Sequence, residues 1–289
     1  KKTSRRAIYV IFLKSLFIPM HKEKLIATWR LICAIQYLIL IIIIVPIIFS
    51  SVANKIPKRR ELASLLYRRF YAALNVKLII KGTPTSQPSL WVGNHISWLD
   101  ILLLGGNNTV DFIAKTEVGD WPVIGSIVKK AGTVLISREN KFQAYRALPQ
   151  LQERIRSGTP LMVFPEGTTT DGRATLPFKP MFYQAAIREK IMIQPISLQY
   201  FNANGDVTDS VAFIGDDEFS TSLKRILKQP KIIAEIHFLP AVPAHHYHRK
   251  QLAELSRHAI NVKMRQQEGA GQTIEEAPIS TVQLSKIYQ

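Results

Sequence analysis

The sequence predicts an α/β domain with a mixed, largely parallel sheet flanked by helices, preceded by an apolar, membrane-anchoring helical segment. Short β-branched or apolar runs alternate with amphipathic stretches, and several runs are continuously hydrophobic, as in strands covered on both faces. A long uncharged run near the N-terminus predicts the anchor. We divide the chain into an anchor with basic flanks (residues 1–60), a domain (61–267) and a polar, aperiodic tail (268–289) that we expect to be disordered.

The uncharged run, from Leu31 to Ser51, has 21 residues. As a helix it is about 30 Å long, roughly the hydrocarbon thickness of a bilayer. It shows no polar stripe, and it is too long and begins too late for a signal peptide. An earlier apolar stretch, Ala7–Met20, is short and interrupted by Lys14 and Pro19. Two arrangements stay open: a helix that spans the membrane, or a hairpin of both segments within one leaflet, with Pro46 bending the longer helix.

The formal charge of +17 favours an anionic partner. Basic residues lie on both sides of the apolar run, which suits anionic lipid headgroups at about 1 kcal/mol per residue near the surface. Because the charge brackets an apolar segment and is not interleaved with aromatic residues, we expect no nucleic-acid partner. The lone Cys33 excludes an internal disulfide. The flanking cations are Lys22, Lys24 and Arg30 before the run, and Lys55, Lys58, Arg59, Arg60, Arg68 and Arg69 after it.

Within the domain, hydrophobic periodicity predicts strands that alternate with helices. The strands are Lys77–Ile80, Leu90–Val92, Phe112–Ala114, Thr133–Ile136, Leu161–Phe164, Ile191–Gln199 and Ile232–Leu239. The helices are Trp98–Leu104, Pro122–Lys130, Lys141–Arg156 with a kink or restart at Pro149, Met181–Glu189 and Arg249–Gln266. In such folds functional residues gather where strands end and helices begin.

The first motif whose residues are candidates for catalysis is Leu90-Trp-Val-Gly-Asn-His-Ile-Ser-Trp-Leu-Asp100. On one regular helix, His95 and Asp100 would point about 140° apart. They meet only if His95 lies in the turn before the helix and Asp100 in its first turns, which the turn formers Gly93 and Asn94 permit. A carboxylate on one imidazole nitrogen leaves the other free to take a proton from a hydroxyl. An isolated pair of this kind is more often a buried histidine with a structural hydrogen bond.

The second motif is Leu161-Met-Val-Phe-Pro-Glu-Gly-Thr-Thr-Thr-Asp-Gly172. A buried strand breaks at Pro165 and is followed by an acid, a glycine and three hydroxyl residues. Gly167 allows close backbone approach, and the N–H and hydroxyl groups of Thr168 to Thr170 have the chemistry to hold an anion or a polar headgroup. Taken alone this motif is weak evidence, since Glu166 would also serve to cap a loop.

Together the two motifs resemble the glycerolipid acyltransferase family, the 1-acylglycerol-3-phosphate O-acyltransferases and related lysophospholipid acyltransferases. The family's histidine and aspartate separated by four residues are matched by His95 and Asp100. Its phenylalanine-proline-glutamate-glycine block is matched by residues 164–167. Further matches, in the same order, are Gly132 to Arg138, Ile193 to Ile196, Phe112 to Lys115 and Pro177 to Lys179. The resemblance covers about residues 76–196.

The resemblance implies acyl transfer from acyl-CoA or acyl carrier protein to the free hydroxyl of a lysolipid in membrane lipid synthesis. It implies that His95 is the general base and Asp100 its orienter, with no metal, cofactor or covalent acyl-enzyme. The absence of a Ser or Cys in a recognisable nucleophile elbow agrees with this. We expect the cytoplasmic membrane, with the domain on its cytoplasmic side. The expected substrate contacts are Asn94, Lys115, Arg138, Glu166, Gly167, Thr168, Thr169 and Lys179.

One departure leaves the acceptor open. Many phosphatidic-acid-forming members have arginine directly after the Glu-Gly-Thr block, where this chain has Thr169. Candidate phosphate partners that remain are Arg138, Lys115, Arg173 and Lys179. The first expectation is 1-acylglycerol-3-phosphate or a related lysophospholipid. The alternative is lyso-ornithine lipid or another non-phosphatidic lysolipid, because lyso-ornithine lipid acyltransferases carry a similar threonine-rich block.

Two other interpretations are weaker. The distant alternative is a non-catalytic basic membrane or nucleic-acid-binding protein. The placement of the charge disfavours nucleic acid, and a non-catalytic lipid-transfer or scaffold protein would predict a damaged His/Asp pair, whereas this pair is intact. The cluster His245-His246-Tyr-His248 suggests a metal site, but no acid or cysteine lies near it in the sequence.

Overall fold

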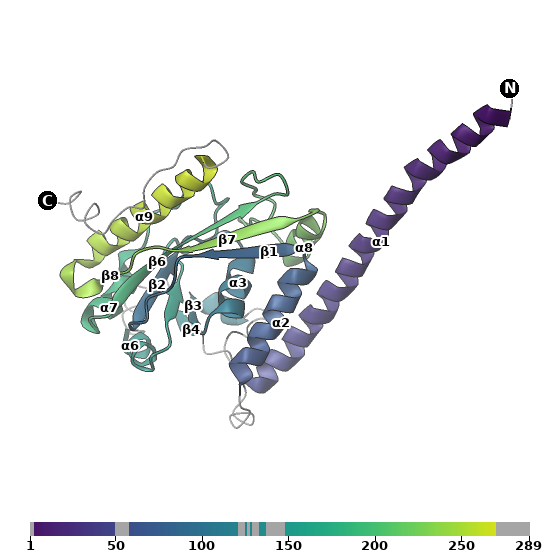
Figure 1. Cartoon of the computed structure of the whole chain (residues 1–289). Helices are drawn as coiled ribbons and strands as arrows, with labels where there is room; N and C mark the ends of the chain where they lie inside the picture. The colour runs from purple at the N-terminus through teal and green to yellow at the C-terminus, as the bar shows by residue number, and fades with distance from the viewer. Residues whose placement is uncertain are drawn as a thin grey trace.

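The structure, a computed structural model, describes residues 3–49, 58–120, 125, 128, 133–136 and 148–269, and for residues 3–24 it describes only the helical backbone. A twisted sheet lies between two layers of helices, and a long N-terminal helix runs past one side of the domain (Figure 1). The elements are α1 (Thr3–Ile48), α2 (Arg59–Ala73), β1 (Val76–Lys81), β2 (Ser89–Gly93), α3 (Leu99–Asn107), β3 (Asp111–Lys115), η2 (Thr116–Asp120), β4 (Val134–Ile136), α6 (Leu148–Arg156), β5 (Leu161–Val163), η3 (Pro180–Phe182), α7 (Tyr183–Arg188), β6 (Met192–Phe201), α8 (Phe219–Leu227), β7 (Ile232–Phe238), β8 (Val242–Pro243), η4 (Ala244–His246) and α9 (Arg249–Gly269).

The sheet is mixed and largely parallel, as predicted. Its order is β1-β7-β6-β2-β5-β3-β4, with β8 paired to β6. Strands β2, β5, β3 and β4 pair in parallel, β6 pairs in parallel with β2, and β7 runs antiparallel to β6. Leu90 lies opposite Leu161 and Val92 opposite Val163. Because the carboxyl ends of β2 and β5 therefore meet at one edge, the segments that follow them come together there.

The hydrophobic core has two parts, one on each face of the sheet. Helices α1, α2, α3 and α8 cover one face, where the buried residues include Leu198 and Ile236. Helices α6, α7 and α9 cover the other, where Ile193 and Leu252 are buried. Burial on both faces explains why the strands are continuously hydrophobic and why the sequence pattern located them.

All seven predicted strands are present, with ends that differ by one or two residues. Three predicted helices correspond to α3, to η3 with α7, and to α9. In the predicted helix 141–156 the described part is α6 (Leu148–Arg156), so the kink or restart expected at Pro149 adjoins residues outside the described part and stays a prediction. Residues 141–147, most of the predicted helix 122–130 and most of the tail lie outside the described residues. Helices α2 and α8 and the short strand β8 were not predicted.

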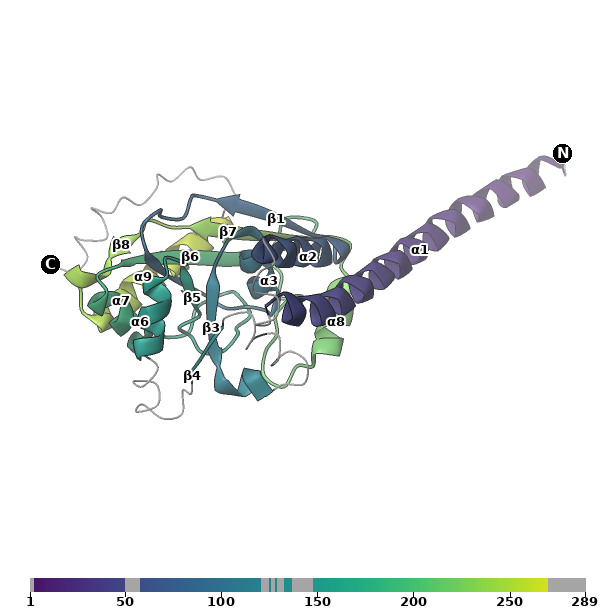
Figure 2. The same ribbon diagram turned by 90° about the horizontal axis from the view of Figure 1, so that it is seen from below.

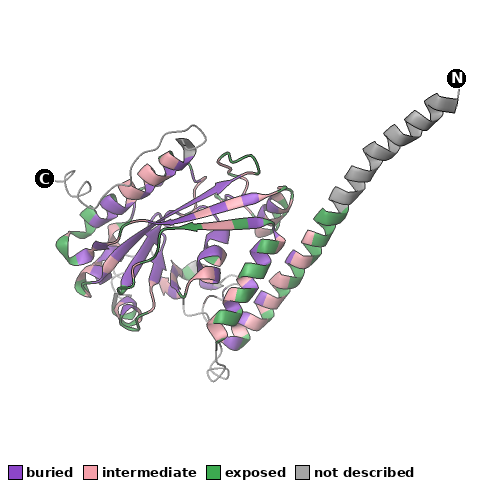
Figure 3. Ribbon diagram, viewed as in Figure 1, coloured by how far each residue is buried: buried purple, intermediate pink, exposed green. Residues whose placement is uncertain are grey.

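The apolar N-terminal segments form one continuous helix, α1, and not a hairpin with each other. Its partner is α2, which lies beside its C-terminal half, while its N-terminal half extends past the domain (Figures 1 and 2). Ala34, Ile41, Val45 and Ile48 are buried on the side that faces the domain. On the other side α1 has exposed residues (Figure 3), among them a stripe of large apolar side chains. This stripe comprises Ile32, Ile35, Ile39, Ile43 and Ile47.

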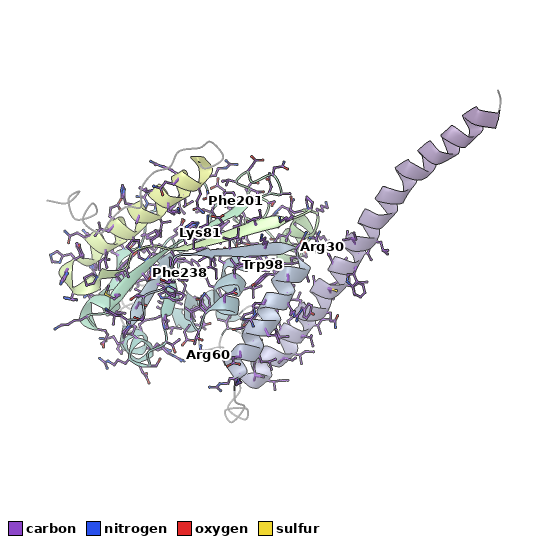
Figure 4. All side chains as sticks on the ribbon, viewed as in Figure 1. Arg30, Arg60, Lys81, Trp98, Phe201 and Phe238 are labelled. Atoms are coloured by element: carbon purple, nitrogen blue, oxygen red, sulfur yellow. The ribbon has the colours of Figure 1, made fainter. Side chains whose placement is uncertain are left out.

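Three of the flanking cations hydrogen-bond to other parts of the protein. The guanidinium of Arg30 donates to the carbonyls of Leu74 (2.8 Å) and Gln229 (3.2 Å), at the ends of α2 and α8 (Figure 4). Arg60 pairs with the buried carboxylate of Asp111 at 2.9 Å, and Arg68 donates to a carbonyl of α3 at 2.6 Å. Helix C-termini carry unpaired carbonyls and a negative partial charge, which explains their attraction for arginine. These bonds fasten α1 and α2 to the domain, while Arg68 remains exposed, and the attraction of the basic flanks to anionic lipid stays a prediction.

Candidate active site

The turn after β2 places the first motif at the carboxyl edge of the sheet. Gly93 ends the strand, and a Cβ there would lie 2.7 Å from the end of the Met162 side chain and 3.2 Å from the Ile196 carbonyl, so a larger residue would require both neighbours to shift. The carboxamide of Asn94 is buried and bonds both the N–H (2.8 Å) and the carbonyl (2.9 Å) of Leu198. These bonds continue the β2–β6 pairing and fix the position of His95 relative to β6.

His95 and Asp100 meet as the sequence predicted, with His95 in the turn and Asp100 in the first turn of α3. Their Nδ1 and Oδ2 atoms are 2.7 Å apart. The Asp100 carboxylate is fully buried, and its Oδ2 also accepts the main-chain N–H groups of Ile96 (2.8 Å) and Ser97 (2.9 Å). Its Oδ1 accepts the hydroxyl of Tyr200 at 2.6 Å. The carboxylate is therefore held rigidly and favours the imidazole tautomer with a proton on Nδ1.

The other imidazole nitrogen, Nε2, is free to take part in proton transfer. The His95 side chain is 18% exposed, and none of the described residues hydrogen-bonds Nε2. The ring of Phe164 stacks on the imidazole with centroids 3.9 Å apart and planes 10° from parallel. Asp100 and Phe164 thus fix the orientation of the ring, and its Nε2 has the lone pair that a general base needs.

Glu166 supports the same turn from the second motif. Its carboxylate is only 4% exposed, and its two oxygens accept the N–H of His95 (2.8 Å) and the N–H of Leu176 (2.7 Å). Burial raises the pKa of Glu166 to about 7, against the lowering effect of these two N–H groups. The nearby Asp100 charge raises the pKa further, and Arg257 of α9 lowers it. The carboxylate therefore faces the main chain, and its predicted contact with a substrate stays a prediction.

The threonine block ties three segments of the site together. Gly167 has a φ of +81°, which glycine adopts readily, and its N–H donates to the Phe164 carbonyl at 3.1 Å. Thr170 donates its N–H (2.8 Å) and, more weakly, its hydroxyl (3.3 Å) to the His95 carbonyl. The hydroxyl of Thr169 donates to the carbonyl of Phe213. The O–H groups of Thr169 and Thr170 thus both point to carbonyls, whereas Thr168 is exposed. Substrate contacts of Gly167, Thr168 and Thr169 stay predictions.

The predicted cationic contacts are only partly described. Lys179 is exposed, and its main-chain N–H donates to the Pro165 carbonyl at 3.0 Å, which places it beside the second motif. The backbone of Lys115 lies in β3, whereas its side chain and all of Arg138 are outside the described residues. Arg173 is exposed, with its Nε 3.9 Å from the Asp171 carboxylate.

Three features of the site were not predicted: Tyr200, the segment around Phe213, and Arg257. The segment is close to the His95 turn because the N–H of Phe213 donates to the Ile96 carbonyl at 3.0 Å. Arg225 of α8 holds it through the Ser210 carbonyl (2.9 Å) and the Asp217 carboxylate (2.5 Å). Only Tyr200 had a sequence signal, because a buried tyrosine hydroxyl requires a partner.

The histidine cluster has no further ligands around it. His245, His246 and His248 are exposed, on and just after η4. In the part of the chain that the structure describes, no group of three His, Cys, Asp or Glu side chains is placed to hold a metal ion.

The shifted pKa of Glu166 predicts a pH-dependent term in stability. The folded protein keeps a proton on this carboxyl from about pH 4.5, its ordinary pKa, to about pH 7. The unfolded chain binds fewer protons in that window, so the free energy of unfolding falls as the pH rises, by up to about 1.4 kcal/mol per pH unit.

Glu166→Gln should remove this pH-dependent term. Urea unfolding at several pH values should give a wild-type minus variant difference that declines with rising pH. A difference for Glu166→Gln that stays flat with pH would contradict the shift.

The sequence and the fold are similar to those of known acyltransferases. The sequence model of the family described as Acyltransferase matches residues 76–199. The chain is 32% identical over 212 residues to lyso-ornithine lipid O-acyltransferase of Pseudomonas aeruginosa, which covers 73% of this chain and 81% of that protein. It is 31% identical over 186 residues to 1-acyl-sn-glycerol-3-phosphate acyltransferase of Neisseria gonorrhoeae, which covers 63% and 72%. The crystal structure of the 1-acyl-sn-glycerophosphate acyltransferase PlsC from Thermotoga maritima shares the fold, with a TM-score of 0.58, 17% identity, and coverage of 86% of this chain and 98% of that one.

Proposed function

Because this chain belongs to the acyltransferase family, we propose that it moves a fatty acyl chain from acyl-CoA or acyl carrier protein to the free hydroxyl of a lysolipid. The observation that carries this proposal is the His95 imidazole, held at Nδ1 by the buried Asp100 carboxylate at 2.7 Å and free at Nε2. That arrangement suits removal of a proton from a hydroxyl. No step of the proposal uses a metal, a cofactor or a nucleophilic side chain.

In the proposed reaction, Nε2 of His95 takes the proton of the acceptor hydroxyl as its oxygen attacks the thioester carbonyl. The resulting imidazolium is stabilised by Asp100. When the tetrahedral intermediate collapses, the new ester forms, the carbon–sulfur bond breaks, and the imidazolium returns the proton to the departing thiolate. General-base catalysis of this kind contributes about 10²–10⁴-fold, and the orientation of the two substrates supplies more.

The direct test is an assay of the purified protein against a panel of acceptors. Lysophosphatidic acid, other lysophospholipids and lyso-ornithine lipid would each be offered with acyl-CoA and with acyl carrier protein. We expect a diacylated product from at least one combination. Absence of product from every combination, with protein that is folded and bound to lipid, would refute the proposed function.

For the acceptor, we propose 1-acylglycerol-3-phosphate or a related lysophospholipid first, with lyso-ornithine lipid as the second candidate. The observation that favours the second is Thr169, a neutral residue whose hydroxyl already donates to the Phe213 carbonyl. An arginine would offer a phosphomonoester charge-assisted, often bidentate hydrogen bonds, roughly twice as strong as neutral ones. Relatives named for each of these two acceptors support both candidates.

Thr169→Arg should therefore raise kcat/KM for lysophosphatidic acid relative to a lysolipid without free phosphate. A relative gain of about tenfold corresponds to roughly 1.4 kcal/mol. The control is Thr169→Gln, which also removes the hydroxyl bond to Phe213 but adds no charge, and it should show no such gain. If the wild type already prefers lysophosphatidic acid strongly and Thr169→Arg only lowers activity, the phosphate is bound elsewhere, and Arg138 is the next residue to substitute.

We propose that the protein lies at the cytoplasmic membrane with its domain on the cytoplasmic side. Residues Leu25–Ile48 of α1 have the length and hydropathy of a membrane span. However, α2 packs along this segment and exposes Arg68 and Arg69, and Arg30 is bonded to the ends of α2 and α8. A span across the bilayer would draw those charges into hydrocarbon at a cost of several kcal/mol. We therefore favour α1 lying with its exposed isoleucine stripe in one leaflet.

A further inference from the structure

Tyr200 joins the site from β6, outside both sequence motifs. The side chain is 1% exposed, and its hydroxyl donates to Oδ1 of Asp100 at 2.6 Å. The strand that carries it is fixed to the His95 turn two residues earlier, where Asn94 bonds both the N–H and the carbonyl of Leu198. The distance from the phenol to the carboxylate is therefore set by the β2–β6 pairing and not by a mobile loop.

The two oxygens of Asp100 have different partners. Oδ2 accepts His95 Nδ1 and the N–H groups of Ile96 and Ser97, whereas Oδ1 accepts only Tyr200 among the described residues. A fully buried carboxylate oxygen without a donor is strongly unfavourable, and it would turn toward any other donor within reach. Burial and the Asp100 charge raise the pKa of Tyr200 well above its ordinary value, so the phenol keeps the proton that it donates.

We propose that Tyr200 is a positioning residue for acyl transfer, which holds Asp100 in the rotamer that orients His95 and shares the charge of the carboxylate. The inference rests on the proposed function of His95 as a base. Its consequence is a pH effect. Without the phenol donor, the negative charge of Asp100 is concentrated near His95, so the His95–Asp100 pair holds a proton more tightly. The neutral imidazole that takes the proton of the acceptor hydroxyl therefore appears only at higher pH.

Other charged groups near the pair come from two elements. Glu166, in the loop after β5, accepts the His95 N–H, and its charge is close enough to Asp100 for each to affect the other. Arg257 of α9 acts on Glu166 from the opposite side. Both residues are present in the wild type and in a Tyr200 variant, so the two pH profiles are compared with the same charged neighbours.

The test compares Tyr200→Phe with Tyr183→Phe. Tyr183 is also fully buried, but it lies on α7 in the core on the other face of the sheet. For Tyr200→Phe we expect kcat to fall about tenfold, the KM for the acceptor to change little, and the acidic limb of the kcat/KM profile to move up by about one pH unit. Tyr183→Phe removes a buried hydroxyl that does not contact the pair, and it should leave that limb in place. A Tyr200→Phe profile that coincides with that of the wild type would overturn the proposal.

A double-mutant cycle separates action through Asp100 from general loosening of the core. If Tyr200 acts through the carboxylate, Tyr200→Phe should cost much less kcat in an Asp100→Asn background than in the wild type. Equal losses in both backgrounds would overturn the proposal. If Tyr200→Phe does not fold, a fluorinated tyrosine at position 200 keeps the ring and makes the hydroxyl a stronger donor. It should move the acidic limb to lower pH, and an unmoved limb would count against the proposal.

The outcomes also distinguish this inference from the proposed function. Wild-type protein that transfers no acyl group to any lysolipid would refute the proposed function without bearing on the phenol bond. Active wild-type protein whose pH profile is insensitive to the Tyr200 changes would refute only the role of Tyr200.

Discussion

His95→Ala should abolish measurable acyl transfer while leaving the fold intact. Removal of the base is expected to lower kcat by about 10²–10⁴-fold. The fold should survive because the bonds that fix this turn use the main chain: the His95 N–H donates to Glu166 and its carbonyl accepts Thr170. An alanine at this position keeps both bonds. Turnover of the best acceptor and thermal unfolding monitored by circular dichroism would test the two halves of this prediction.

Two further variants test whether the loss of turnover belongs to His95 and its partner Asp100. His245→Ala alters an exposed histidine in η4 and should leave turnover unchanged. Asp100→Asn should cost less than His95→Ala but still orders of magnitude, because it favours the wrong imidazole tautomer. It should also lower stability, since an amide NH₂ in this buried position would face N–H or O–H donors. Near-normal turnover by the His95 variant would rule out the mechanism.

The catalytic pair was predictable because its geometry is local. Five residues separate His95 from Asp100, and the turn formers between β2 and α3 restrict how the chain can pass from one to the other. The partners that hold this pair are distant in sequence: Glu166 lies 71 residues from His95, and Tyr200 lies 100 residues from Asp100. No local pattern encodes such contacts, which depend on the order of the strands in the sheet.

The fold was predicted best where hydrophobic patterning matched burial. The strands have apolar side chains on both faces and were found. Helix α2 was missed because Arg60 and Arg68 bond to the Asp111 carboxylate and to an α3 carbonyl on its packed side, which blurs the usual separation of polar and apolar faces. For helix α1 the difficulty was the lack of any polar face. It is apolar all round, so its sequence did not indicate which side packs on the domain and which remains exposed.

That division of α1 into two faces leads to the last prediction. Ile35, Ile39 and Ile43 are 44%, 49% and 52% exposed, while residues of the opposite face pack on the domain. If lipid covers the exposed halves of these side chains, each contributes about 1 kcal/mol to membrane affinity, or about 3 kcal/mol together. The triple substitution of these isoleucines by serine should therefore weaken binding to anionic liposomes by about two orders of magnitude.

Substitution is a sharper test than removal of residues 1–60, because removal would also uncover the α2 face and the carbonyls now bonded to Arg30. Co-sedimentation with liposomes would measure binding, and the melting temperature should stay close to that of the wild type. Two controls define the face. Ile80→Ser, at an exposed position on β1, should leave binding unchanged, whereas Ile41→Ala, on the packed side of α1, should lower stability more than binding. If the triple variant pelleted with liposomes as well as the wild type, the exposed stripe would not be the membrane-binding face, and the flanking cations would have to supply the affinity alone.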